Sequence, residues 1–253
     1  MTSHQRDHQI VIENVTKRYG DHCVVDDLTF TVQPGRITGF LGPNGSGKST
    51  TMKVLLDLAA ADHGTTAIGG HRYRDLPDPA GTVGVVLEPN AFHPGRSGRN
   101  HLRILAQATD LPPERVDETL AIVGLDPRAA GRRVGTYSLG MKQRLSLAAA
   151  LLTDPPVLIL DEPANGLDPQ GIRELRDLLR ARAARGHTVL VSSHLLTEVE
   201  HVVDDVVVID QGRLVTTGTI AELTRGSARV RTPDAGRLAE CVAAAGGRVE
   251  TAG

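Results

Sequence analysis

Short apolar runs alternate with longer amphipathic segments along most of this chain. Apolar or alternating runs predict β-strands at Gln9–Glu13, Val24–Val32, Ile37–Leu41, Thr65–Ile68, Thr82–Leu87, Val157–Leu160, Thr188–Val191 and Val206–Ile209. Helical periodicity predicts α-helices at Thr50–Leu58, Ser97–Thr109, Pro113–Val123, Ser138–Thr153 and Pro169–Ala184. Fully apolar strands such as Val157–Leu160 are typical of buried parallel sheets. The alternation of strands and helices therefore predicts a doubly wound α/β domain.

The pattern changes near residue 225. We predict one domain over residues 1–225 and a short C-terminal extension over residues 226–253. Within the extension, the sequence favours a strand, a helix and the start of a second strand, at Ala228–Arg231, Asp234–Ala245 and Arg248–Glu250. This order is that of an incomplete accessory βαβ unit.

Composition narrows the class of protein. The 253 residues carry a formal net charge of −2, and a chain without a basic excess is not typical of nucleic-acid binders. Three Tyr, three Phe and no Trp leave few rings for base stacking. Cys23 and Cys241 stand far apart, and residues 1–8 lack the apolar stretch of a secretory signal. With no apolar run long enough to span a bilayer, we expect a soluble cytosolic protein.

The clearest chemical signal is a phosphate-loop pattern, a Gly, four residues and then Gly-Lys-Ser. Its members and the residue after them are Gly42, Pro43, Asn44, Gly45, Ser46, Gly47, Lys48, Ser49 and Thr50. The predicted strand before it and helix after it are the context that this motif needs. The glycines let backbone N–H groups turn toward a phosphate, and the helix N-terminus adds partial positive charge. Lys48 could reach the β- and γ-phosphates and Ser49 could ligate Mg²⁺, so we predict a nucleoside triphosphate site.

Two carboxylates follow the apolar run Val157–Leu160. Asp161 and Glu162 would lie at the carboxyl end of a strand, where ligands bind in open α/β sheets. Asp161 suits a direct or water-mediated role at Mg²⁺, and Glu162 could accept a proton from an attacking water. A solvated acidic turn is the alternative, and the phosphate loop upstream favours the functional interpretation.

Two further segments predict a function only in combination with the motifs above. His194 follows the apolar run Thr188–Val191, where it could contact a γ-phosphate, although alone it would be read as a surface histidine. Ser138 is a good helix cap and Gly140 allows close backbone approach, so this helix start could bind an anion. An ordinary capped helix is the alternative, and the order of the motifs decides against it.

In order and spacing, these motifs resemble those of the nucleotide-binding subunits of ABC transporters. The resemblance covers about residues 9–225. It implies a P-loop NTPase fold with a mostly parallel core sheet, an N-terminal antiparallel β subdomain and a helical subdomain at roughly 89–155. Gly42–Thr50 matches the Walker A loop, Val157–Glu162 matches Walker B, and Ser138–Met141 matches the signature.

Single residues extend the resemblance. Tyr19 matches the aromatic residue that stacks on adenine, and His194 matches the switch histidine. Asn165–Asp168 resembles the D-loop, which implies that Asp168 lies at the nucleotide.

The signature departs from the usual Leu-Ser-Gly-Gly-Gln, since this chain has Tyr-Ser-Leu-Gly-Met from Tyr137. Ser138 and Gly140 keep the residues that contact phosphate. Leu139 and Met141 replace Gly and Gln, and in this they are similar to the drug-exporter branch of the family.

A second departure is Glu88, at a position where the family normally has a Gln that touches Mg²⁺ and the attacking water. A carboxylate can ligate Mg²⁺ but cannot donate a hydrogen bond as Gln does. We assign Glu88 to catalysis and to Mg²⁺ by this resemblance. The alternative is that Glu88 faces solvent and that the register differs by one residue.

The resemblance implies ATP and Mg²⁺ as ligands, ATPase activity and a head-to-tail dimer. Ser138, Gly140 and Met141 would contact the ATP bound at Lys48 of a second copy or of a related subunit. A separate integral membrane permease is the implied partner, met by the segment at about residues 90–105, with the chain at the inner face of the membrane. The implied cargo is a hydrophobic small molecule such as a drug or antibiotic, exported by the complex.

Other functions stay open at this point. A non-transport ABC ATPase acting on ribosomes or DNA usually has two cassettes or a long coiled coil, and residues 57–136 show no heptads. An importer subunit fits the signature and the extension less well. A regulator that binds ATP without turnover has only Glu88 in its favour.

Overall fold

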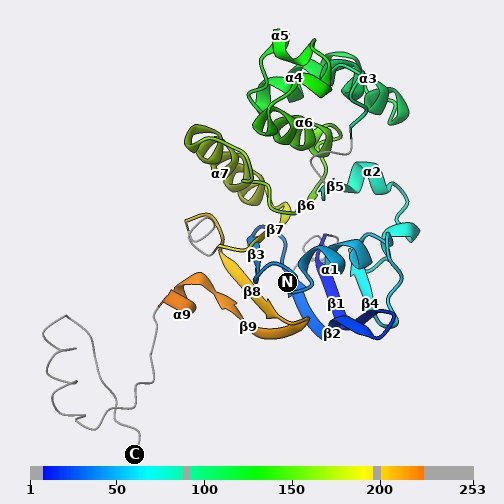
Figure 1. The fold of residues 1–253 in the computed structure, drawn as a ribbon, viewed down its shortest axis with the longest axis vertical. Coiled ribbons are helices and arrows are strands. Elements are labelled where there is room, and N and C mark those ends of the chain that lie inside the picture. Colours follow the sequence, from blue (N-terminus) through cyan, green and yellow to red (C-terminus); the bar gives the residue numbers. More distant parts are fainter. Residues whose placement is uncertain (1–7, 88–91, 196–200, 225–253) are drawn as a thin grey trace, which may run out of the picture. The chain divides into compact units, whose positions relative to one another are not determined.

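Figure 1 shows the computed structural model of the chain, which describes residues 8–87, 92–195 and 201–224. The chain divides into two compact units, Met1–Ile220 and Ala221–Gly253. The second unit begins within the short helix α9 (Ile220–Thr224). The predicted extension at residues 226–253 and the candidate Glu88 lie outside the described residues, so both stay predictions.

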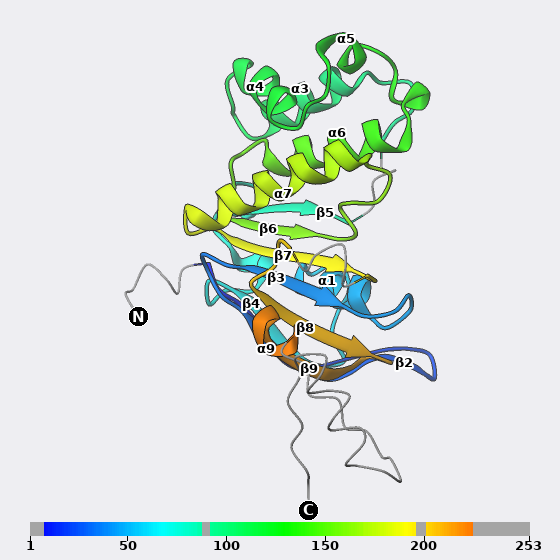
Figure 2. The same cartoon turned by 90° about the vertical axis from the view of Figure 1, so that its left-hand side faces the viewer.

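Six strands form the central sheet in the order β5-β6-β7-β3-β8-β9. The first five in this order pair in parallel, namely β5 (Val83–Val86), β6 (Val157–Leu160), β7 (Thr188–Ser193), β3 (Ile37–Leu41) and β8 (Asp205–Asp210). The edge strand β9 (Arg213–Thr219) pairs antiparallel with β8. The carboxyl ends of the parallel strands therefore lie along one edge (Figure 2). This confirms the predicted mostly parallel sheet.

A second, antiparallel sheet has the order β2-β1-β4, built from β1 (Ile10–Tyr19), β2 (His22–Val32) and β4 (His63–Ile68). Phe30 of this sheet contacts Phe40 of the central sheet, with ring centroids 5.1 Å apart. The main core cluster joins both sheets to helix α1 (Lys48–Leu55) through buried residues that include Ile12, Leu28, Phe40, Met52, Leu55 and Ile159. Burial of these side chains is the main favourable term that holds the two sheets together.

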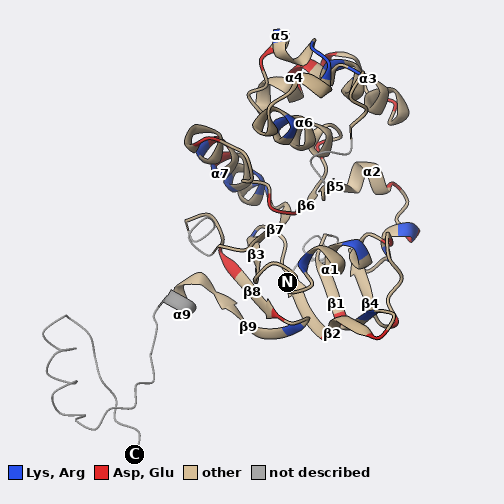
Figure 3. Ribbon diagram, viewed as in Figure 1, with Lys and Arg blue, Asp and Glu red and all other residues tan. Residues whose placement is uncertain are grey.

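The remaining helices are α2 (Pro79–Thr82), α3 (Gly98–Ala108), α4 (Glu114–Ile122), α5 (Pro127–Ala130), α6 (Leu139–Leu151) and α7 (Pro169–Ala184). Helices α3 to α6 gather at one end of the first unit (Figure 1). Leu175, Leu179 and Ala183 recur every four residues on α7 and are buried. Charged residues of both signs also lie along α7 (Figure 3). No helix in the described part of the chain is long and apolar enough to cross a membrane.

Several predicted boundaries were wrong. The helix predicted at Thr50–Leu58 begins at Lys48 and ends at Leu55, and Asp57 beyond it has a left-handed backbone with φ of 54°. Thr82 belongs to α2 rather than to the strand that follows. Strand β9 was not predicted, because it is an edge strand whose mostly exposed residues show no apolar alternation.

A polar cluster lies at the opposite end of the parallel strands from their carboxyl ends. Arg182 of α7 is buried, forms an ion pair with Asp154 at 2.6 Å and lies 3.2 Å from Nδ1 of His187. Burial lowers the pKa of His187, and the nearby Arg182 and Arg185 lower it further, while Asp154 acts in the opposite sense. The folded protein therefore favours the neutral imidazole, whose Nδ1 can accept a hydrogen bond from Arg182.

This cluster predicts acid sensitivity of the fold. Below the ordinary His pKa of 6.5, the unfolded chain binds more protons than the folded chain, so the free energy of unfolding falls as pH falls. We expect His187→Gln to make that fall shallower between about pH 7 and about pH 5, as measured by urea unfolding at each pH. The control is His93→Gln at an exposed position. Equal slopes in wild type and His187→Gln would contradict the prediction.

Candidate functional site

The loop between β3 and α1 is shaped by glycines. Gly45 and Gly47 have positive φ values of 82° and 104°, which side-chain-bearing residues rarely adopt. A Cβ atom on Gly47 would also lie 2.6 Å from the carbonyl oxygen of Val24. Gly47 is the N-cap of α1, and no side chain of the described residues caps the helix. The first N–H groups of α1 are therefore available to an anion, and the buried Ser46 Oγ nearby has no partner in the described part of the chain.

Lys48 is the first residue of α1 and is only 6% exposed. Its Nζ donates to the carbonyl oxygens of Gly42 at 2.6 Å and Pro43 at 3.1 Å. The same Nζ lies 4.0 Å from Oε1 of Glu162. The loop thus holds a buried ammonium group, a point charge suited to a phosphate.

Asp161 connects three elements at the carboxyl end of the sheet. It follows β6, is 8% exposed, and accepts hydrogen bonds from Ser49 of α1 at 2.5 Å and from the hydroxyl of Ser192 on β7. A hydroxyl beside a buried carboxylate is an oxygen donor set of the kind that Mg²⁺ prefers. The described residues contain no group of three or more His, Cys, Asp or Glu that could hold a metal. A cation held here could take further ligands from phosphate and water, and Glu88, outside the described residues, stays a candidate ligand.

Glu162 is held at both its backbone and its carboxylate. Its N–H donates to Ser192 Oγ at 2.9 Å, and its Oε2 lies 2.9 Å from Nδ1 of His194. A carboxylate accepts only, so this contact is a hydrogen bond when Nδ1 carries the proton. The backbone of Glu162 has a positive φ of 49°, an uncommon conformation that is frequent at functional sites. The structure thus brings together two of the predicted site residues, His194 and Glu162.

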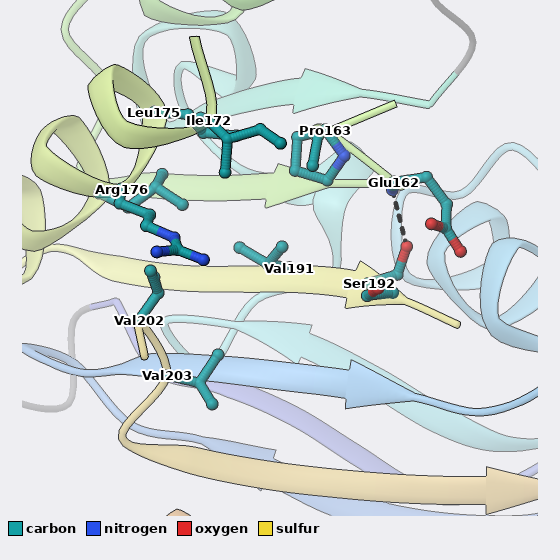
Figure 4. Close-up of a pocket in the computed structure, with 12 residues that line it drawn as sticks. Glu162, Pro163, Ile172, Leu175, Arg176, Val191, Ser192, Val202 and Val203 are labelled. Carbon is teal, nitrogen blue, oxygen red and sulfur yellow. Dashed lines mark hydrogen bonds between the residues drawn. The ribbon is translucent and has the colours of Figure 1, made fainter. Parts of the chain in front are cut away.

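A small cavity of about 30 Å³ lies beside this turn, between α7 and β7 (Figure 4). Glu162 and Ser192 lie at one end of it, and Arg176 extends toward it from α7. Most of the other lining residues are apolar, including Ile172, Leu175, Val191, Val202 and Val203. Only the end of the cavity formed by Glu162 and Ser192 is part of the candidate ATP site.

Ser192 is a site residue to which the sequence analysis gave no role. It is fully buried and its hydroxyl joins the carboxylate of Asp161 to the N–H of Glu162. The sequence signal that could have indicated this role is a serine that follows the apolar run of a strand and directly precedes Ser193-His194.

The predicted signature residues lie at the start of α6. Ser138 caps the helix by accepting the N–H of Met141 at 3.2 Å, and Leu139 is 50% exposed. Within the described residues, no hydrogen bond or ion pair connects Ser138, Gly140 or Met141 with Lys48. The predicted phosphate contacts of these three residues stay predictions.

Two other predicted residues make their contacts outside the carboxylate cluster. Asp168 caps α7, with Oδ1 accepting the N–H of Gly171 at 2.9 Å. This cap gives Asp168 a structural role at the start of α7. Tyr19 ends β1 and is 53% exposed, with Lys17 Nζ 5.0 Å from its ring centroid. Its ring is open to a ligand, and its adenine contact stays a prediction.

Comparison with known proteins agrees with this geometry. Residues 25–165 match the ABC transporter family. The chain is an ABC transporter ATPase subunit. It is 42% identical over 207 residues to an uncharacterized ABC transporter ATP-binding protein, YhcH, of Bacillus subtilis strain 168, covering 81% of this chain and 68% of that protein. It is 41% identical over 218 residues to the bacitracin transport ATP-binding protein BcrA of Enterococcus faecalis, covering 85% and 70%.

A solved structure described as the ATP-binding subunit of an ABC transporter is 30% identical to the chain. The two superpose with a TM-score of 0.77 over 85% of this chain and 92% of that one. The ABC ATPase fold and the binding of ATP therefore follow from membership of the family.

The bonds of Ser192 predict a defect in turnover. Ser192→Ala removes a hydrogen bond to a carboxylate and the acceptor of the Glu162 N–H, so we expect kcat for ATP hydrolysis to fall about 10-fold, since a bond to a charged group contributes about 1.5–3 kcal/mol. ATP affinity should change little, because Lys48 and its loop are untouched. Steady-state phosphate release and equilibrium ATP binding separate the two effects.

The matched control is Ser146→Ala, which removes another buried hydroxyl, one that donates to the Lys142 carbonyl oxygen at 3.1 Å on α6. Wild-type kcat in Ser192→Ala would show that the hydroxyl does not organise the two carboxylates.

Proposed function

We propose that this ABC ATPase powers the export of a hydrophobic small molecule through a separate membrane permease. The observation that carries the proposal is the convergence of Lys48, Ser49, Asp161, Glu162 and His194 at the carboxyl ends of β3, β6 and β7. The bacitracin transport relative supports export and an antibiotic-like cargo. The signature residues Leu139 and Met141 support the same branch by resemblance.

The loop and Lys48 would bind the phosphates of ATP. The uncapped N–H groups of α1 supply donors, and Lys48 Nζ supplies a positive charge beside them. Lys48 Nζ lies between the loop carbonyl oxygens and Glu162, where it would meet the β- and γ-phosphates. Tyr19 would stack on adenine with its exposed ring.

Ser49 and Asp161 would hold Mg²⁺, with Glu88 as a further candidate. When bound, the ion would supply positive charge that offsets the negative charge developing on the phosphate oxygens. Asp161 is fixed for this role by Ser192, which leaves its carboxylate little freedom to turn away. The Ser49 hydroxyl would exchange its bond to Asp161 for the ion.

Glu162 would act as the general base. A water molecule gives a proton to the Glu162 carboxylate while its oxygen bonds to the γ-phosphorus. The bond from that phosphorus to the oxygen bridging β and γ breaks, and ADP leaves with that oxygen. His194 holds Oε2 at 2.9 Å, which orients the carboxylate and leaves Oε1 facing the Lys48 side of the site.

A head-to-tail dimer would complete each site. Ser138, Gly140 and Met141 at the start of α6, together with Asp168, would close on the ATP held by the other subunit. Closure with ATP and opening after hydrolysis form a population shift that a bound permease can use. The chain would then work at the inner face of the membrane through that permease.

The base assignment predicts a variant that binds but does not turn over. Glu162→Gln keeps the size of the side chain but cannot accept the proton, so we expect phosphate release to fall about 10²-fold or more. ATP binding should persist, because Lys48 and the loop are intact. Light scattering should then show the dimer mass for Glu162→Gln in ATP and the monomer mass without it.

Two comparisons make this test specific. Glu114→Gln, at an exposed position on α4, should hydrolyse ATP as wild type does. Lys48→Ala should weaken ATP binding and so prevent the dimer. Near-normal turnover in Glu162→Gln would remove Glu162 from the role of base, and an ATP-bound monomer would remove the shared site.

A further inference from the structure

Helix α6 is bonded to the segment that carries Glu162. This segment, residues 162–168, connects β6 to α7 and has positive φ values at both Glu162 and Gly166. Residues on one face of α6 contact it near its start, its middle and its end. The contact near the start is made by Gln143.

Gln143 is a buried polar residue that packing does not explain. It is 0% exposed, and its Nε2 donates to the carbonyl oxygen of Pro163 at 3.0 Å. A carbonyl oxygen can only accept, so the amide nitrogen must face Pro163. The other amide atom, Oε1, is buried and has no partner among the described residues. An apolar side chain of similar size would avoid this unpaired oxygen, so the bond to Pro163 is what the glutamine adds.

The middle of the segment is in direct contact with the start of α6. A Cβ atom on Gly140 would lie 2.6 Å from the carbonyl oxygen of Gly166, and one on Gly166 would lie 2.5 Å from Leu139 Cγ. Gly140 and Gln143 are three residues apart on α6, so they share a face of the helix.

Arg144 holds the end of the segment. Its Nη2 lies 3.8 Å from Asp168, its Nη1 donates to Glu174 of α7 at 2.7 Å, and it also donates to the carbonyl oxygen of Val123 at 2.6 Å. These contacts join α6 to residues 162–168 near the start, the middle and the end of the segment.

We infer that Gln143 is a positioning residue that couples the two ATP sites of the dimer by tying α6 to the Glu162 turn. The inference rests on the proposed function, in which Ser138 and Gly140 meet the ATP of the partner subunit while Glu162 serves the ATP of its own chain. When α6 shifts as its start binds the partner's ATP, the bond from the Gln143 amide to the Pro163 carbonyl oxygen moves Pro163. Glu162 directly precedes Pro163 in the chain and moves with it. One site then sets the position of the general base in the other.

The test mixes active and inactive subunits of the full chain. Wild type is mixed with Glu162→Gln at varied ratios before ATP is added, and phosphate release is measured. Coupled sites make activity fall with the square of the active fraction, to about one quarter at an equal mixture. When every subunit also carries Gln143→Met, which fills the space without the donor, we expect a linear fall to about one half.

Further readouts separate coupling from a fold defect. ATP affinity of Gln143→Met should stay within about 2-fold of wild type, and the Hill coefficient of its ATPase should fall toward 1. Gln107→Met, the same change at an exposed position on α3, should keep the wild-type curve.

A squared dependence in Gln143→Met, even with lower overall activity, would overturn the coupling role and leave the proposed function intact. A linear curve in wild type that still hydrolyses ATP would also overturn the coupling, whereas a Glu162→Gln chain that stays monomeric in ATP would overturn the shared site of the proposed function.

Discussion

The carboxylate of Asp161 is the contact on which this site depends. It follows β6 and accepts hydrogen bonds from the hydroxyls of Ser49 on α1 and Ser192 on β7. One buried group therefore connects three elements. The strand order β6-β7-β3 brings these ends side by side, and parallel pairing puts them at the same edge. Removing the carboxylate would leave two hydroxyls without their acceptor and would free the turn that carries Glu162.

This arrangement separates rigid parts of the site from parts that can move. The phosphate loop is fixed by its glycines and by Lys48. Glu162 is held by the hydrogen bond that its N–H donates to Ser192 Oγ and by the contact of its carboxylate with His194. Hydrogen bonds of this kind can be exchanged as a ligand enters, so the loop offers a ready anion site and the base is adjustable. The contacts of α6 with residues 162–168 give that adjustment a route to a second subunit.

Local patterns were enough to predict the phosphate loop and the Walker B strand. Each consists of a short apolar run followed directly by its chemical groups, so Lys48 and Glu162 could be assigned before any contact was known. The resemblance added His194, Tyr19 and the signature, because their meaning lies in the order of motifs. The contact between His194 and Glu162 then followed from two adjacent parallel strands.

Contacts between distant residues could not be predicted in this way. Ser49 and Asp161 are 112 positions apart, and the pairing of their hydroxyl and carboxylate needs the strand order. The role of Gln143 depends on its bond to Pro163, 20 positions away. The role of Ser192 depends on its bond to Glu162, 30 positions away. Both bonds connect different secondary-structure elements. Strand β9 carries too few buried residues to show a pattern, and its place comes from pairing with β8.

The central claim is that this ATPase acts on a membrane permease, and affinity capture tests it most directly. The Glu162→Gln chain would be captured with ATP from detergent-solubilised membranes of its source, and its partners would be identified and quantified by mass spectrometry. The account predicts a stoichiometric protein with several membrane spans. Recovery of ribosomal proteins or DNA-bound factors alone would contradict it and would indicate a soluble ABC mechanoenzyme.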